Sequence, residues 1–297
     1  MAEPTRRAGY AAAAAPAVFV FLWSTGFVVA RYATDDAGPL TFLTVRVLIA
    51  AAVLALIAAI SGAPRPTRRG AAWSAIAGLG LQAAYLGGVF LAIDAGLPSG
   101  VSALIGALHP VVTAAVAGPL LGEHLRRIQW LGVGLGLAGV VAVVVDRLRD
   151  GTADVRAGAV VAVSVATLGM SVGTLIHRRR AADVPLLWGT VAQFASSAVV
   201  LGVGSVVVEE VEITFTASTV WSLAWSVGVL SIAAVLTMMW LLGRRAAAKV
   251  SSLFFLFPAL SAIEGAILFG ERLGVLAVGG FALALLGVAL TTRASTS

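Results

Sequence analysis

Residues 108–125 read LHPVVTAAVAGPLLGEHL, and residues 256–273 read LFPALSAIEGAILFGERL. The two stretches lie 148 residues apart and carry a leucine, a proline and a Gly-Glu pair in the same register. This register continues without a gap over residues 99–144 and 247–292, where two further glycines match. Matched leucines mean little in so apolar a chain. A proline and a glutamate spaced by thirteen residues in both copies mean more, and they indicate an internal repeat.

Composition assigns the repeat to a membrane. Of the 297 residues, 60% are hydrophobic and only 11% are charged, with a mean hydropathy of +1.00, whereas soluble domains carry roughly 25% charged residues. The apolar residues form blocks of about twenty, the length at which a helix crosses roughly 30 Å of hydrocarbon. These blocks predict ten transmembrane helices at 12–32, 39–60, 71–93, 99–121, 128–146, 157–177, 185–208, 219–242, 247–269 and 273–291.

The repeat divides the predicted helices equally, five in residues 1–150 and five in residues 151–297. Because five is an odd number, the second copy must enter the membrane from the opposite side. Inverted repeats of this kind are common in secondary transporters, whose substrate sites lie between the halves near the midplane. The predicted fold is therefore an all-α integral membrane protein of two inverted five-helix repeats.

The basic residues predict the orientation. Fourteen Lys and Arg lie between the predicted helices on the side of the N-terminus and five on the other side, with Arg46 inside a helix. Because cytoplasmic loops carry the excess of Lys and Arg, both termini are predicted to be cytoplasmic. The pI near 10.9 does not indicate a nucleic-acid partner, since the basic clusters alternate with apolar blocks. The chain has no cysteine, which excludes disulfides and thiolate metal sites.

Three stretches resemble the EamA-type members of the drug/metabolite transporter superfamily. They are WSTGFVVARYATDDAGPLTFLTVRVLIAA at 23–51, SALIGALHPVVTAAVAGPLLGEHLRRIQWLGVGLGLAGVVAVV at 102–144 and KVSSLFFLFPALSAIEGAILFGERL at 249–273. The resemblance covers nearly the whole chain. It implies a ten-helix transporter of a bacterial inner membrane with a central cavity, often an exporter of amino acids or other small metabolites. His109 and Glu264 depart from the family pattern, which usually has apolar or small residues there.

Glu264 has no acidic counterpart in the first repeat, where Val116 takes its place. It lies about midway along the predicted helix 247–269, where a carboxylate costs roughly 3 kcal/mol. Such a group must face a wet cavity, find a partner or stay protonated. Two interpretations are open: a site for proton coupling or a substrate amine, and a neutral glutamic acid that is hydrogen-bonded to neighbouring helices.

Arg46 and His109 are the other ionisable candidates. Arg46 lies about two turns into its helix and could snorkel outward; it either ties helix ends together or binds a substrate carboxylate. His109 precedes Pro110, which frees a carbonyl group and bends the helix. Its imidazole either bonds such a carbonyl or titrates in the translocation path. Pro110 and Pro258, at equivalent positions, are predicted hinges.

The remaining polar residues are expected to have smaller roles. Trp23, Gln82 and Tyr85 are predicted to line the cavity, on their positions in the family and their size. Glu123 and Glu271 are expected to cap the helices that they begin. The glycines of GVGLGLAG at 132–139 predict close helix packing, in a monomer or at the face of a homodimer. Other polar residues inside the predicted helices are expected to join helices: Ser24, Thr25, Ser171, Thr174, Gln193 and Thr237.

These features predict a secondary transporter that exports or exchanges small polar, amino-acid-like metabolites by alternating access. Exchange or a proton gradient would drive it, because no nucleotide-binding glycine loop with lysine is present. No cofactor or metal is expected, and the partners are the substrate and the bilayer. The alternatives are a lipid or lipophilic-cation flippase or efflux protein, and a membrane scaffold. An embedded enzyme is disfavoured, since the polar residues are too scattered for a catalytic site.

Overall fold

The computed structural model describes residues 21–121, 126–150, 157–233, 236–237, 257–271 and 274–293. Within these ranges the regular elements are helices, apart from one isolated β-bridge between Ala37 and Ile213. The predicted all-α class is therefore confirmed. Five helical stretches among the described residues are long and apolar enough to cross a membrane: Pro39–Ile60, Arg68–Asp94, Arg127–Asp146, Ala157–Ala181 and Leu186–Val208.

Local sequence sets the helix ends in the first half of the chain. Pro39 occupies the first turn of its helix, where a missing N–H costs nothing. Thr67 Oγ1 accepts a hydrogen bond from Gly70 N at 3.0 Å and so caps the next helix. Gly62 and Gly96, with φ of +65° and +92°, allow turns that other residues rarely adopt. The elements are the helical residues 21–34, α2 (Pro39–Ile60), α3 (Arg68–Gly78), η1 (Leu79–Ala84), α4 (Tyr85–Asp94), α5 (Ser99–Ala107), α6 (His109–Leu121) and α7 (Arg127–Asp150).

The second half follows the predicted blocks in the same way. Its elements are α8 (Ala157–Ile176), η2 (His177–Ala181), α9 (Leu186–Val208), α10 (Ala217–Trp225), η3 (Ser226–Ala233), α13 (Phe257–Phe269) and α14 (Val275–Arg293). Their bounds lie within a few residues of the prediction wherever the chain is described. The predicted helix starts at 12 and 247 lie outside the described residues.

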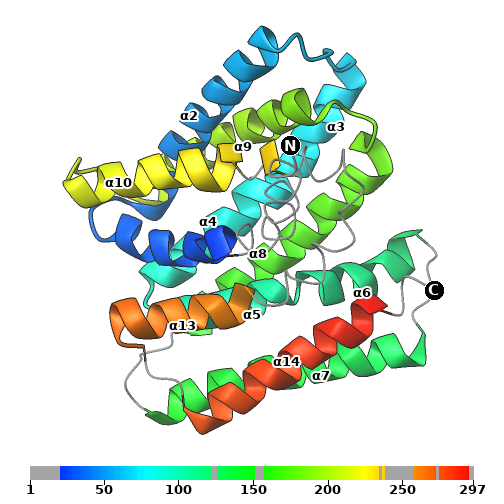
Figure 1. The fold of residues 1–297 in the computed structure, drawn as a ribbon, viewed down its shortest axis with the longest axis vertical. Coiled ribbons are helices and arrows are strands. Elements are labelled where there is room, and N and C mark those ends of the chain that lie inside the picture. The colour runs from blue at the N-terminus through cyan, green and yellow to red at the C-terminus, as the bar shows by residue number, and fades with distance from the viewer. Residues whose placement is uncertain are drawn as a thin grey trace, which may run out of the picture.

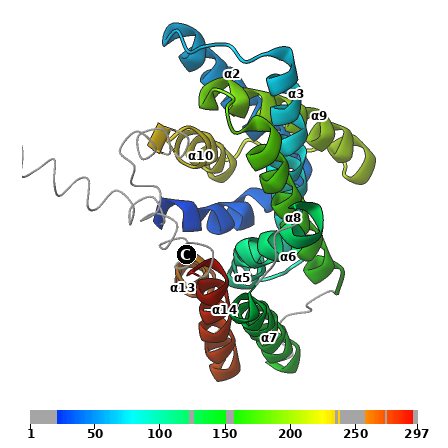
Figure 2. The same ribbon diagram turned by 90° about the vertical axis from the view of Figure 1, so that its right-hand side faces the viewer.

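Helices that correspond in the two repeats pack against each other. Helix α2 lies beside α9 at one end of the long axis and α7 beside α14 at the other (Figures 1 and 2). Between these pairs α5 lies beside α13, which corresponds to α6 in the 148-residue register. Gly132, Gly136 and Gly139, among the glycines of residues 132–139, lie in the α7–α14 contact, whereas among the described residues Gly134 has open space around it. A Cβ on Gly139 would approach Gly280 O to 2.5 Å, and one on Gly287 would approach Gly132 O to 2.5 Å. These glycines therefore serve close packing inside the chain.

The segments that connect the helices carry mostly acidic side chains where the helices end on one side of the molecule, and mostly basic side chains where they end on the other. We call these two sides the ends of the bundle. At one end, residues 36–41 meet residues 209–216, with Thr214 N donating to Asp36 O at 2.9 Å. At the other end, Trp188 Nε1 donates to Ala63 O at 3.1 Å. We call the first the acidic end, for Asp35, Asp36, Asp94, Glu209, Glu210, Glu212 and Glu271. The segment between α2 and α3, the start of α7 and η2 lie at the second end (Figure 1). We call it the basic end, for the arginines that these segments carry: Arg65, Arg68, Arg69, Arg126, Arg127, Arg178, Arg179 and Arg180.

Candidate substrate and coupling site

Ser24, in the helical residues 21–34, holds the carboxyl group of Glu264 on α13. Its Oγ lies 2.6 Å from Glu264 Oε1 and 2.7 Å from the carbonyl oxygen of Phe21. Ser261 Oγ donates to the carbonyl oxygen of Ser24 at 3.0 Å, which fixes the two helices together. Both serines are fully buried. Glu264 Oε2 is buried without a hydrogen-bond partner, so the carboxyl group retains unused bonding capacity.

This geometry makes the Ser24 hydroxyl responsive to the charge of Glu264. A hydroxyl has one proton to donate, and two acceptors lie within reach of Ser24 Oγ when Glu264 is ionised. A protonated Glu264 removes the competition, because it donates to Ser24 Oγ while the serine donates to Phe21 O. Ionisation draws the serine proton to Glu264 Oε1 instead. The charge on Glu264 thus decides which bond the buried serine makes.

Glu264 lies nearer to the acidic end than the midpoint expected from the sequence. Helix α13 ends at Phe269, five residues later, which is about 8 Å along a helix axis. Arg46 is at a similar depth, seven residues after Pro39 at the start of α2, or about 10 Å. The two ionisable side chains therefore lie at comparable distances from the same end of the bundle.

Arg46 points into the bundle. Only 6% of its surface is exposed, so the side chain is packed inside the bundle and does not extend over its surface, although the sequence allowed that. It shares the buried face of α2 with Phe42, whose ring stacks on Phe90 of α4 at 5.9 Å between centroids. Its Nε is buried and has no hydrogen-bond partner. The guanidinium therefore makes no contact through Nε that would tie helix ends together.

His109 lies at an interruption of its helix. Helix α5 ends at Ala107, α6 begins at His109, and Pro110 follows. His109 Nδ1 lies 3.0 Å from Thr113 Oγ1 and 3.3 Å from Ser171 Oγ on α8. Nδ1 thus contacts two hydroxyls, whereas the sequence suggested a carbonyl freed by proline. The residues before Phe257 are not described, so a bend at Pro258 stays a prediction.

The three predicted cavity residues occupy separate places. Tyr85 is buried on α4, and a Cβ on Gly106 would come within 2.8 Å of its hydroxyl, just before the interruption at Leu108. Gln82 lies in η1. Trp23 is half-buried and adjoins Ser24. The structure thus places Trp23 next to the partner of Glu264 and Tyr85 beside α5. In the described residues no hydrogen bond or ion pair joins Glu264 to Arg46 or His109.

Two segments of wider π-helix were missed by the sequence reasoning. They are η1 (Leu79–Ala84) and η3 (Ser226–Ala233), which the 148-residue repeat superposes, whereas a third π-segment, η2, has no such counterpart. Gly80 and Gly228 match in this register, which was the available signal. Single π-turns inside α-helices are frequent at functional sites. The two halves therefore carry the same irregularity at the same level.

Glu271 caps a helix other than the expected one. Its Oε1 accepts hydrogen bonds from Ser99 N at 2.9 Å and Ser99 Oγ at 3.0 Å, at the start of α5. Glu209 does the same for α2, accepting from Leu40 N at 2.7 Å and Thr41 N at 3.1 Å. The expectation that Glu271 caps its own following helix is wrong. Glu123 lies outside the described residues.

Comparison with known sequences decides the family. The sequence profile of the EamA-like transporter family matches residues 9–145 and again residues 157–293. The chain belongs to this family. It is therefore a membrane transporter, and the two matches correspond to the two copies of the repeat.

In the described residues, no group of three or more acidic or histidine side chains is placed to hold a metal.

Relatives of this EamA-like transporter are found in enteric bacteria. The protein of Escherichia coli K12 named "uncharacterized inner membrane transporter YedA" is 26% identical over 256 residues, covering 85% of this chain and 81% of the relative. A Salmonella typhimurium LT2 protein named "probable amino-acid metabolite efflux pump" is 24% identical, covering 91% and 90%. A crystal structure with 21% identity aligns with a TM-score of 0.64 over 95% of this chain and 96% of that chain. The transporter thus belongs to the bacterial inner membrane.

Proposed function

We propose that this EamA-like transporter exports or exchanges small amino-acid-like metabolites by secondary transport, without a cofactor or metal. One observation carries the proposal. Arg46 and Glu264 are side chains of opposite charge type, lie at similar depth, and each keeps a buried polar atom without a hydrogen-bond partner. An amino acid supplies a carboxylate for the first and an ammonium group for the second. Guanidinium binds carboxylate through two parallel hydrogen bonds.

The name of one relative supports this substrate class. The Salmonella protein, which aligns over most of both chains, carries amino-acid metabolite efflux in its name. We propose the same class and direction for this chain, in which Trp23, Gln82, Tyr85 and His109 would line the path. The protein would work as a monomer or a homodimer.

We also propose the ten-helix architecture, with inverted repeats at residues 1–150 and 151–297 and both termini in the cytoplasm. Three observations support it. Corresponding helices pack in pairs, α2 with α9 and α7 with α14. The close glycine contacts of Gly139 and Gly287 are reciprocal under the repeat. Basic and acidic connections separate to opposite ends of the bundle, as the positive-inside rule requires.

Proton coupling would follow from the bond between Glu264 and Ser24. The proton on Glu264 determines whether Ser24 bonds the carboxyl group or the carbonyl of Phe21. Ser24 belongs to the first repeat and Glu264 to the second, so protonation of Glu264 changes a contact between the halves. Alternating access requires such a change in the course of the cycle, around the interruption at Leu108 and the π-segments η1 and η3.

Counterflow in liposomes tests the substrate class. Purified protein in vesicles preloaded with unlabelled amino acid should accumulate labelled amino acid from the outside. Arg46→Gln removes a charge-assisted hydrogen bond, which contributes roughly 1.5–3 kcal/mol, and should weaken apparent affinity at least about tenfold. Glu210→Gln, at an exposed position of the acidic end, serves as the control and should leave transport unchanged. Absence of counterflow for every amino acid, with movement of labelled lipid instead, would replace the proposal with a flippase.

A further inference from the structure

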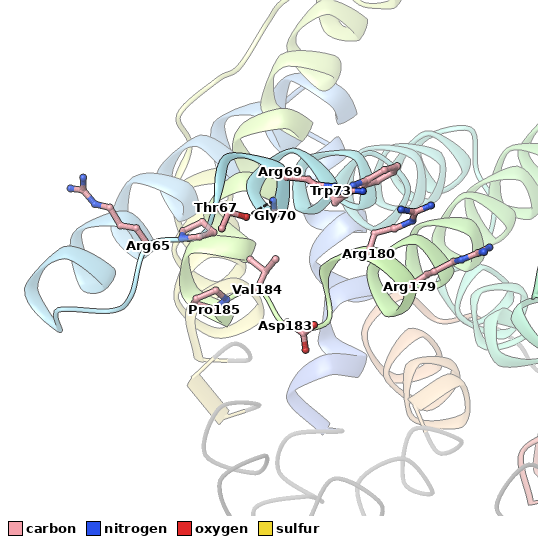
Figure 3. Close-up of a pocket in the computed structure, with 11 residues that line it drawn as sticks. Arg65, Thr67, Arg69, Gly70, Trp73, Arg179, Arg180, Asp183, Val184 and Pro185 are labelled. Carbon is pink, nitrogen blue, oxygen red and sulfur yellow. Dashed lines mark hydrogen bonds between the residues drawn. The ribbon is translucent and has the colours of Figure 1, made fainter.

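A pocket of about 450 Å³ opens at the basic end, apart from the proposed substrate path. It lies between α3 of the first half and the segment from η2 to α9 of the second half (Figure 3). Figure 3 shows Trp73 beside Arg180 along one side, with Asp183 and Pro185 below them. The ionisable and aromatic side chains that line it are Arg65, Arg69, Trp73, Arg179, Arg180 and Asp183.

The pocket is strongly basic. Four arginines and one carboxylate, Asp183, line it, and Figure 3 shows Arg65 pointing away from the other three. Arg180 lies over the ring of Trp73 at 5.1 Å, and Arg65 lies 6.0 Å from the ring of Trp188. Such stacking orients a guanidinium while leaving its N–H edge available. Among the described residues, Arg65, Arg69 and Arg180 form no ion pair with a carboxylate, so their charge is not neutralised within the pocket.

The geometry points to a site for the phosphate group of an anionic phospholipid. Guanidinium groups match phosphate oxygens through two parallel hydrogen bonds. The first turn of the 11-residue helix α3 lines the same pocket and adds the positive end of its dipole. Basic pockets between transmembrane helices on the cytoplasmic side bind such headgroups. Free phosphate shares this chemistry, but the pocket lies where two membrane-spanning helices reach the surface, within reach of lipid.

Occupation of this pocket would join the two halves of the protein. Arg65 and Arg69 precede or begin α3, while Arg179 and Arg180 lie in η2. A phosphate held by Arg69 of α3 and Arg180 of η2 neutralises two arginines that form no ion pair with a carboxylate in the described residues. The bound lipid would therefore stabilise the folded protein, and would do so whatever the transported substrate is.

Thermal unfolding of the purified protein with added lipid tests the site. Phosphatidylglycerol should raise the melting temperature of the wild type, whereas phosphatidylcholine and inorganic phosphate should not. The double variant Arg69→Gln/Arg180→Gln should bind phosphatidylglycerol about 30-fold more weakly and lose the shift. Arg127→Gln, which is exposed at the same end outside the pocket, should keep it. Retention of the lipid in native mass spectrometry gives a second readout.

A gain-of-binding variant covers the case in which the double variant does not fold. Asp183→Asn removes the carboxylate and leaves the arginines, so it should enlarge the shift produced by phosphatidylglycerol. Glu212→Gln, an exposed acid at the opposite end, is the matched control and should not. An equal shift in wild type and double variant, no gain with Asp183→Asn, or an equal shift from inorganic phosphate would each overturn the lipid site.

Discussion

At the scale of single residues, one buried hydroxyl connects the chemistry of the two halves. Ser24 lies within bonding distance of Glu264 Oε1 and of its own helix backbone at Phe21 O. An ionised carboxylate near hydrocarbon is unfavourable. When Glu264 is neutral, it donates to Ser24 Oγ, and the serine donates to Phe21 O. When Glu264 is ionised, the serine can donate to only one of these two acceptors. The second carboxyl oxygen, Oε2, stays available for a substrate amine. Proton and substrate would then compete for the same group, which is the arrangement that proton–substrate antiport requires.

Glu264→Gln tests whether this proton moves. The amide is neutral at every pH and can donate to Ser24 as the protonated acid does, so the variant should insert and fold normally. It should lose proton-driven accumulation. Substrate-for-substrate exchange should persist with weaker apparent affinity, because exchange need not release the proton and the amide oxygen still accepts a hydrogen bond from the substrate amine. Uptake is measured in liposomes with and without a pH gradient, across a pH series. Wild-type accumulation by a normally expressed Glu264→Gln protein would leave Glu264 as a helix-packing group.

At the scale of elements, the π-segments η1 and η3 are equivalent in position but differ in how closely they are packed. Gly80 of η1 lies against α8, where an added Cβ would come within 2.9 Å of the Cα of Gly173. Around Gly228 of η3, its counterpart in the repeat, the described part of the chain places no other side chain or helix within 4 Å of a built Cβ. The η1–α8 contact therefore depends on glycine, while η3 has room at the same point.

This difference supplies a matched pair of variants. Gly80→Ala should force η1 and α8 apart and destabilise the protein by about 1–3 kcal/mol, the usual range for overpacking. Gly228→Ala should be tolerated, and the added methyl should even favour the helix slightly. Thermal unfolding in detergent measures both. Equal stability of the two variants would contradict the close η1–α8 contact.

At the scale of the whole molecule, the two ends of the bundle differ in charge, and pairs of corresponding helices lie side by side at either end of the long axis. The acidic end is joined across the repeats, since Glu209 caps α2 and Glu271 caps α5. The basic end carries the arginine pocket. Cytoplasmic loops are enriched in Lys and Arg, and the proposed orientation therefore has the basic end in the cytoplasm.

Cysteine labelling tests this orientation in a chain that has no native cysteine. Thr214→Cys at the acidic end and Ser61→Cys at the basic end both replace exposed residues. In intact cells a membrane-impermeant thiol reagent should label only Thr214→Cys. After the cells are opened, Ser61→Cys should react as well, which controls for its accessibility. Labelling of Ser61→Cys in intact cells would reverse the orientation.

The sequence by itself determined the helical class, the position of nearly every described helix and the internal repeat. Each of these depends on short stretches of sequence. The length of an apolar block predicts a membrane span, Pro39 and Gly62 mark helix ends, and a repeated proline and glutamate reveal the second copy. It also singled out Glu264 and Arg46, because charged residues in apolar helices stand out without any knowledge of their neighbours.

Only the tertiary structure decided what those residues contact. Ser24 is 240 positions from Glu264, and Ser99 is 172 positions from Glu271, so no local pattern could pair them. Arg46 was expected to reach outward, yet the packing of α2 turns it into the bundle. The arginine pocket likewise needs α3 and η2 side by side. The hydropathy of a residue predicts whether it is buried. A hydrogen bond depends on which helices are neighbours, and only the packing of the helices decides that.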